Sequence, residues 1–219
     1  MRPVSLILLA GLLAGLLAVD VNAMNAVGDA YGVEDGELRY REIHRCSSDG
    51  DRCTVEYTTP AGELFARKVV DYQESLQAPS LEMQDMRHGE TVRVNSEDDE
   101  DLVIDAGFDH YVRLRWEQLV SGETVRFPFL VAGRDSALDM AASRSGPESC
   151  PQGRMCFTVA LDNWLLSRLV TPIRLEYDAQ NKRLLQFRGV SNIRDAQGKS
   201  QQVRIDYRYP ESSAEGSTS

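Results

Sequence analysis

Hydrophobic and polar residues alternate along most of this chain, and one long stretch departs from that alternation. Between Val103 and Ala132 the apolar positions follow first the period of a helix and then that of a strand. Asp105 stands where a helix N-cap is expected, and Gly122 where a left-handed C-cap is expected. From Phe108 onward, one broad arc of the helical projection collects the apolar side chains of Tyr111, Val112, Trp116, Leu119 and Val120. This helix must bury that face against another part of the protein.

Counting the strand that ends this stretch, the alternation predicts about ten strands, most of them joined by short turns and therefore antiparallel. The expected strands are Glu37–Arg45, Cys53–Thr59, Glu63–Tyr72, Leu81–Arg87, Glu90–Asn95, Thr124–Ala132, Ser136–Ser143, Phe157–Leu161, Ile173–Tyr177, Arg183–Val190 and Ser200–Tyr209. Trp164–Val170 is expected to form a brief second helix that is apolar nearly all round. Such a helix lies either deep in the core or against a partner.

The width of this sheet decides the expected fold. Ten strands spaced ~4.8 Å apart make a sheet roughly 48 Å wide, whereas one helix covers only ~10 Å of it. Two helices, one of them very short, therefore cannot cover the apolar face of the sheet. We expect a mainly β protein in which a single curved antiparallel sheet, a half-barrel or barrel, packs on one longer and one short helix. Such a sheet can leave an apolar cavity on its concave side.

The N-terminus has the pattern of a secretory signal. Arg2 precedes an apolar run from Val4 to Val19, which is shorter than the ~20 residues of a spanning helix. Small residues before the end of the segment favour cleavage near Ala23, and an uncleaved anchor is the alternative. We expect a signal peptide over 1–23, a flexible lead-in over 24–36, one β-rich domain over 37–210 and a disordered tail over 211–219. Cleavage leaves 219 − 23 = 196 residues, enough for one domain with a real core.

Charge and cysteines narrow the class of protein. The net charge of −10 argues against nucleic acid, or an anionic membrane surface, as the main partner. The four cysteines form two close pairs, Cys46 with Cys53 and Cys150 with Cys156, each around a Gly-containing loop. Disulfides are favoured over a redox or zinc site, because neither pair has the C-x-x-C spacing. The protein is therefore expected in the periplasm or outside the cell.

Two acidic segments are weak candidates for cation binding. Ser96–Asp101 and Asp49–Asp51 are rich in carboxylates, but both lack the alternating ladder of a Ca²⁺ loop. We interpret the longer segment as a solvated run of charge. No metal site and no cofactor are expected.

Four stretches of the chain resemble a family of uncharacterised secreted proteins of Gram-negative bacteria. They are GELRYREIHR, PAGELFARKVVDY, DAGFDHYVRLRWEQLVSGETVRFPFLVA and PIRLEYDAQNKRLLQFRGVSNIRDAQGK, of which DAGFDHYV and RGVSNI are the most specific segments. The resemblance implies a location more than an activity. More loosely, the layout is similar to the lipoprotein-carrier half-barrels of the LolA and LolB type, in which a curved sheet capped by helices holds acyl chains. That likeness concerns architecture alone and assigns no residue.

Several side chains are candidates for ligand binding. Arg115 falls inside the apolar arc of the long helix, where it either meets an anionic head group or packs its stem while its guanidinium reaches solvent or bonds a carbonyl. Four aromatic side chains line either a lipid cavity or an ordinary core: Trp116, Phe127, Phe129 and Trp164. Leu165 and Leu169 are candidates for contact with a partner.

Catalysis has little support in the sequence. The chain has three histidines, of which His110 lies on the polar side of the long helix, and no nucleophile elbow, H-E-x-x-H motif or phosphate loop accompanies them. We therefore expect a non-catalytic periplasmic protein that binds or carries an apolar or lipid-like ligand, either a lipid or a lipidated protein. The alternative is a structural or accessory envelope protein that acts through contact with an envelope partner. A hydrolase is the least favoured class.

Overall fold

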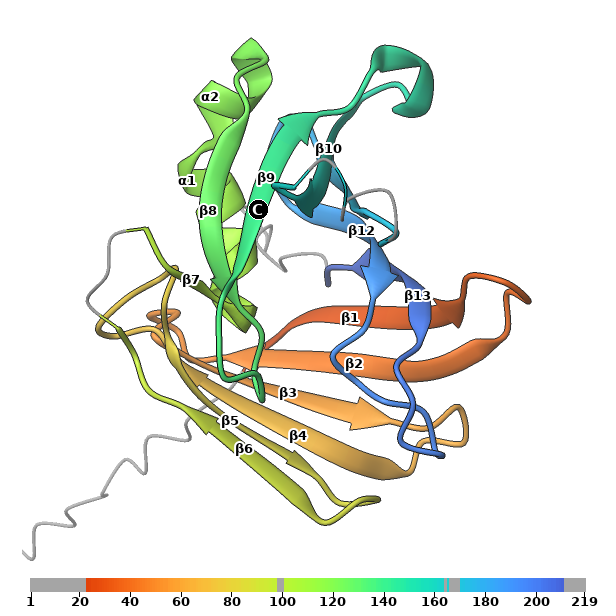
Figure 1. Cartoon of the computed structure of the whole chain (residues 1–219). Coiled ribbons are helices and arrows are strands. Elements are labelled where there is room, and N and C mark those ends of the chain that lie inside the picture. Colours follow the sequence, from red (N-terminus) through yellow and green to blue (C-terminus); the bar gives the residue numbers. More distant parts are fainter. Residues whose placement is uncertain (1–22, 98–100, 164, 166–169, 211–219) are drawn as a thin grey trace, which may run out of the picture.

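The computed structural model describes residues 23–97, 101–163, 165 and 170–210, which form a single curved sheet of 13 strands (Figure 1). The strands are β1 Ala23–Gly32, β2 Leu38–Cys46, β3 Arg52–Thr58, β4 Leu64–Asp71, β5 Ser80–Asp85, β6 Glu90–Val94, β7 Val103–Ile104, β8 Val125–Leu130, β9 Leu138–Arg144, β10 Arg154–Leu161, β11 Ile173–Asp178, β12 Leu184–Val190 and β13 Gln202–Arg208. The expectation of a mainly β protein built on one curved sheet is confirmed.

The order of the strands explains how the sheet is assembled. It runs β6-β5-β4-β3-β2-β1-β13-β12-β11-β10-β9-β8-β7, so almost every strand pairs with its neighbour in sequence. The exception is the pair of β1 and β13, which joins the first strand to the last in the middle of the sheet. All described pairings are antiparallel except that of β7 with β8. Because β6 and β7 are the two ends of this order, the sheet is a half-barrel and is not closed.

The first strand corrects one prediction. The segment 24–36 was expected to be a flexible lead-in, but most of it belongs to β1, which lies between β2 and β13. The alternation is hard to see because its buried positions are small, namely Ala26 and Ala30. Gly28 must also be small, because an added Cβ would lie 2.8 Å from side-chain atoms of Ile205 and Tyr207. Small residues in a strand mark close packing here rather than disorder.

Both expected disulfides are present. Cys46 and Cys53 are directly opposite each other in the hairpin of β2 and β3, and Cys150 is bonded to Cys156 of β10. Disulfides persist in oxidising compartments, so the two bonds indicate that the protein works outside the reducing cytosol.

The long helical pattern forms two short helices instead of one. A 3₁₀ turn over Asp105–Gly107 leads into α1 Phe108–Leu114, and α2 Trp116–Ser121 follows after Arg115. Gly122 ends α2 with φ 95°, as the sequence predicts. The predicted N-cap role of Asp105 is wrong, because Gly107 takes that position and no side chain caps α1. A second 3₁₀ turn spans Pro147–Ser149, and the expected helix over Trp164–Val170 lies outside the described residues except for its Leu165 and Val170.

Two groups of buried side chains fill the inner face of the sheet. The first lies on β1–β5 and β13 and includes Tyr40, Tyr57, Val70, Leu81, Val203 and Ile205, together with Ile104 of β7 and Ile193 of the β12–β13 connection. The second lies on β8–β11 beneath α1 and α2 and includes Tyr111, Trp116, Phe127, Met140, Phe157, Leu175 and Tyr177. Phe187 of β12 packs against both groups, so the two parts of the core are continuous.

Candidate functional site

The candidate ligand site is the face of β8–β11 that α1 and α2 cover. We call residues 108–121 the helical cover. Its side chains Tyr111, Val112, Trp116 and Leu119 are all buried against this face. The exposed Leu114 and Glu117 lie on the other side of the cover, as the helical projection predicts.

Aromatic side chains dominate the contact between cover and sheet. The ring of Trp116 lies 5.3 Å from that of Phe157 and 5.5 Å from that of Tyr177, both with edge-to-face geometry. The rings of Tyr111 and Phe127 are 4.7 Å apart. Phe129 lies 5.4 Å from Phe108 of the cover. The structure therefore brings together Trp116, Phe127 and Phe129, three of the residues proposed from the sequence.

Arg115 occupies the interruption between α1 and α2. Its φ of −92° and ψ of 13° depart from helical values, although its N–H still donates to Tyr111 O over 3.0 Å. The side chain is half-buried, and its guanidinium carbon lies 5.4 Å from the centre of the Tyr111 ring. Among the described residues, its Nε is the one buried side-chain polar atom that has no hydrogen-bond partner. An unpartnered donor of this kind costs free energy, so Arg115 marks a weak point in the cover.

The best-formed hollows of the described residues do not lie beneath the cover. The two best-formed hollows have volumes of about 180 and 160 Å³, and both lie on the outer face of β10–β12. Their lining side chains Arg174 and Arg188 alternate with the buried Leu175 and Gly189 along the same strands. The inner face is instead filled by the protein's own side chains.

Polar contacts hold the margins of the cover. The hydroxyl of Tyr177 donates to Asp109 Oδ1 over 3.0 Å at one end, and Arg144 donates to the carbonyl of Val120 over 2.9 Å at the other. Between them, Lys182 Nζ lies 3.3 Å from Glu117 Oε1. The last pair is largely exposed and contributes little stability.

A buried ion pair anchors the start of the cover to the opposite part of the sheet. Lys68 of β4 and Asp105 of the 3₁₀ turn are each only 6% exposed in their side chains, and Nζ lies 2.5 Å from Oδ1. The amide of Asn192 donates to both carboxylate oxygens of Asp105, and the N–H of Ala132 donates to Oδ2 over 3.4 Å. One carboxylate thus joins β4, the β8–β9 connection and the β12–β13 connection.

The local backbone is constrained where it forms this junction. Asp105 adopts φ 31°, a region that side-chain-bearing residues rarely occupy and that costs roughly 1–3 kcal/mol. At Gly107 an added Cβ would lie 2.1 Å from the carbonyl oxygen of Gln77, so only glycine fits. The hydroxyl of Tyr72 donates to the carbonyl of Ala106 over 3.2 Å. The turn Asp105–Gly107 is therefore fixed in its conformation, and it sets the direction in which the cover begins.

The electrostatics of Asp105 follow from its surroundings. Burial alone would raise the pKa of the Asp105 carboxyl, but the adjacent Lys68 ammonium and the hydrogen bond from Asn192 outweigh it and lower the pKa below its ordinary value. The carboxylate is therefore ionised at neutral pH. Such a fully partnered pair is well suited to fixing the geometry of a fold.

Sequence reasoning did not identify this junction, although one signal was present. Lys68 lies on the same face of its strand as Ala66 and Val70, both of which are buried. A lysine among buried apolar positions requires a buried anion. What the pattern cannot reveal is that the anion belongs to Asp105, which is 37 residues away in sequence.

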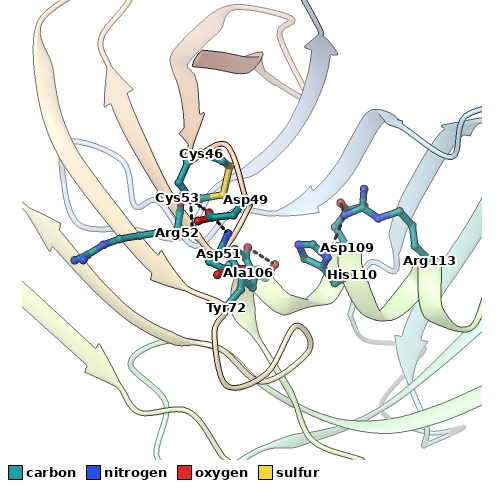
Figure 2. The surroundings of a disulfide bond; sticks show 11 residues. Cys46, Asp49, Asp51, Arg52, Cys53, Tyr72, Ala106, Asp109, His110 and Arg113 are labelled. Carbon is teal, nitrogen blue, oxygen red and sulfur yellow. Dashed lines mark hydrogen bonds and ion pairs between the residues drawn. A yellow bond between two sulfur atoms is a disulfide. The ribbon is translucent and has the colours of Figure 1, made fainter. Parts of the chain in front are cut away.

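His110 has surroundings that do not support catalysis. Its ring lies 4.7 Å from that of Tyr72, and its Nδ1 faces a guanidinium nitrogen of Arg113 at 3.4 Å (Figure 2). Burial, together with the charge of Arg113, lowers the pKa of His110 and keeps the ring neutral at neutral pH. No serine, threonine or cysteine is hydrogen-bonded to His110 among the described residues, so a hydrolase mechanism gains no support here.

The remaining expectations concern metals, membranes and the partner contact. The residues that the structure describes contain no group of three or more His, Cys, Asp or Glu side chains that could hold a metal ion. No helix among them is long and apolar enough to cross a membrane. Leu165 is 56% exposed, whereas Trp164 and Leu169 lie outside the described residues.

Comparisons with known proteins add no assignment. The sequence matches no family model and no curated protein.

Proposed function

We propose that the protein is a non-catalytic binding protein of the periplasm that holds an apolar, lipid-like ligand between the helical cover and the inner face of β8–β11. The observation behind this proposal is the composition of that interface. An aromatic and aliphatic sheet face is covered by two short helices that are interrupted at Arg115. The oxidising compartment indicated by the disulfides is consistent with such a role.

The ligand takes the place of the cover's own side chains. Because the inner face is already filled, binding requires the cover to move away from the sheet. An acyl chain then replaces the contacts that Trp116 and Leu119 make, and burial of apolar surface stabilises either state by roughly 25 cal/mol per Å². The free energy cost of lifting the cover is in this way largely offset by the ligand.

Arg115 is a suitable partner for a polar end of the ligand. Its unpartnered Nε and its place at the interruption of the cover suit a carboxylate head group, which would satisfy this donor. We therefore expect the ligand to be a long-chain acid rather than a neutral hydrocarbon.

The first test is binding of a fluorescent long-chain fatty acid to the mature protein. Tyr177→Phe removes the hydroxyl that holds Asp109, so it should favour the lifted cover and tighten binding about fivefold. Tyr209→Phe is the matched control, because the hydroxyl of Tyr209 donates to the carbonyl of Leu184 and not to a residue of the cover. Arg115→Met should weaken binding of the fatty acid but not binding of a neutral alkyl probe.

Two outcomes would refute carriage of a ligand under the cover. One is that neither wild type nor Tyr177→Phe binds the probe. The other is that hydrogen exchange at residues 108–121 is unchanged when the probe binds, because the cover would then have stayed in place. Native mass spectrometry of protein purified from the periplasm, showing a co-purified lipid, would support the proposal directly.

A second candidate function is that of an accessory envelope protein acting through contact with another protein. The filled inner face favours it, because such a protein needs no cavity. Leu165 and Val170 are 56% and 47% exposed and flank the segment in which Leu169 was proposed as a contact. Exposed apolar side chains are a common feature of docking surfaces.

A pull-down separates the two functions. A double variant that carries Leu165→Asp and Leu169→Asp should abolish capture of the envelope partner while leaving fatty acid binding unchanged. Leu114→Asp is the control, because Leu114 is 66% exposed on the outer side of the cover. Loss of the partner with the control variant as well would refute a specific contact through this segment.

A further inference from the structure

Three arginines stand side by side on the outer face of the sheet. Arg174 of β11 is directly opposite Arg188 of β12, and Arg188 is directly opposite Arg204 of β13. Like charges in directly opposed positions repel each other and destabilise a sheet. The row therefore needs an explanation other than stability.

Most arginines of the described residues contact a carboxylate, and two members of this row do not. Arg204 lies 3.1 Å from Asp206 and also stacks over the ring of Tyr31 at 5.1 Å. Arg174 and Arg188 are exposed, and neither makes a hydrogen bond, ion pair or ring contact within the described part of the chain. The chain has 34 acidic and only 24 basic residues, so carboxylates are not scarce. Two adjacent guanidinium groups are thus left for a ligand.

The surface around these two arginines is hollowed. Both line a hollow of about 180 Å³ on one side and a second hollow of about 160 Å³ on the other. Ser145 and Thr158, whose hydroxyl oxygens are 2.8 Å apart, line the first hollow and are further donors. Glu176 also lines it, but its charge is paired with Arg154. Each hollow is smaller than the ~300 Å³ typical of pockets for drug-sized molecules, so a compact ligand fits best.

We propose that Arg174 and Arg188 form a binding site for a phosphate-type oxyanion, either free phosphate or the phosphate of a lipid head group. Guanidinium groups donate paired hydrogen bonds in a plane that matches phosphate oxygens, and two neighbouring groups can hold one anion from both sides. The bound anion also removes the repulsion between the two arginines. The site is independent of the helical cover, because it lies on the opposite face of the sheet.

Calorimetric titration of the phosphate-free mature protein with inorganic phosphate tests the site. Arg174→Gln and Arg188→Gln should each weaken phosphate binding about tenfold or more, since each loses charge-assisted hydrogen bonds. Arg134→Gln is the matched control, because Arg134 is exposed and makes no described ion pair, and lies in the β8–β9 connection. An equal effect of the control and the site variants would overturn the proposal, since it would reveal only a response to net charge.

Vesicle flotation distinguishes the two sources of phosphate. Binding to phosphatidylglycerol vesicles that is lost in Arg174→Gln and Arg188→Gln assigns the site to a lipid head group. Binding of inorganic phosphate without vesicle binding assigns it to a free anion, and the overall negative charge of the protein favours this result. If wild type binds neither inorganic phosphate nor the vesicles, the proposal is overturned.

Thermal unfolding separates a binding role from a structural one. In phosphate-free buffer Arg188→Gln should unfold at the same temperature as wild type or slightly higher, because the variant removes repulsion. Added phosphate should raise the unfolding temperature of wild type and not that of the variant. A lower unfolding temperature for the variant without phosphate would indicate that Arg188 stabilises the fold, against the proposal.

Discussion

The two ends of the sheet bury their inner faces by different means. On β8–β11, the helical cover supplies apolar side chains, and aromatic rings such as those of Trp116 and Phe157 meet edge to face. This interface needs no specific polar pairing in its interior. Apolar packing of this kind is non-directional, so one apolar surface can be exchanged for another.

On β1–β5, non-helical connections take the place of the helices, and buried polar groups hold these connections and the strands together. Lys68 is paired with Asp105, the hydroxyls of Tyr40 and Ser191 are 2.7 Å apart, and Tyr207 donates to the buried Glu42 over 3.0 Å. Each bond demands one geometry, and loss of a single partner leaves a buried group unsatisfied. One end of the sheet is therefore suited to exchange its cover, and the other is suited to hold it.

The largest effect is expected from breaking the buried ion pair. Lys68→Met leaves the Asp105 carboxylate buried without a cation and should lower the free energy of unfolding by about 3–5 kcal/mol, measured by urea denaturation. Lys182→Met is the control, because its pair with Glu117 is mostly exposed and should cost less than about 1 kcal/mol. Adding Asp105→Asn to Lys68→Met should restore part of the loss. Equal losses in Lys68→Met and Lys182→Met would contradict the role of the pair.

A similar but smaller effect is expected from the apolar cover. Trp116→Ala removes a side chain that is 5% exposed and should cost about 3 kcal/mol, the low end for such changes because the cover can settle into the space. Leu114→Ala, at an exposed position of the same cover, should change stability little. Because an apolar ligand can replace lost apolar packing but not a lost cation, an apolar probe should recover stability in Trp116→Ala but not in Lys68→Met. If the probe restores the stability of both variants, or of neither, the two ends of the sheet do not differ in this way.

The same difference explains what the sequence could predict. Alternation located β2–β6 and β8–β13, and the width argument anticipated a curved sheet, because both depend on local period and on simple geometry. The helical arc identified Trp116 as a buried residue of the cover for the same reason. The Asp105 side chain was assigned to a cap, because its bond to Lys68 spans 37 residues and leaves no local pattern. The row of Arg174 and Arg188 was also missed, since it depends on strand register.

The two disulfides also differ in what they support. Their sequence separations of 7 and 6 residues predict nearly equal stabilisation of about 2.5 kcal/mol on the chain-entropy model. In the loop between Cys46 and Cys53, the carbonyl of Asp51 also accepts a hydrogen bond from the N–H of Tyr72 over 2.7 Å (Figure 2). The ring of Tyr72 in turn lies next to that of His110.

Replacing Cys46 and Cys53 by serine should therefore lower the unfolding temperature more than replacing Cys150 and Cys156. The measurement is thermal unfolding of the two double variants side by side. Hydrogen exchange at the start of α1 should rise only in the first variant, because that loop supports Tyr72 and through it His110. A larger loss from the second pair would mean that the first loop does not support the cover.

A smaller difference should appear as a function of pH. The folded pKa of Asp105 lies below its ordinary value of about 3.9, because Lys68 and Asn192 outweigh the effect of burial. Its stabilisation is therefore complete above that ordinary value and is lost as the pH falls below it toward the folded pKa. The difference in free energy of unfolding between wild type and Asp105→Asn should be constant above about pH 5 and should shrink below about pH 4. In Lys68→Met the cation is gone and burial raises the pKa of Asp105, so the dependence should reverse and that variant should gain stability as the pH falls from neutral. The same slope in both proteins would show that Lys68 does not control the charge of Asp105.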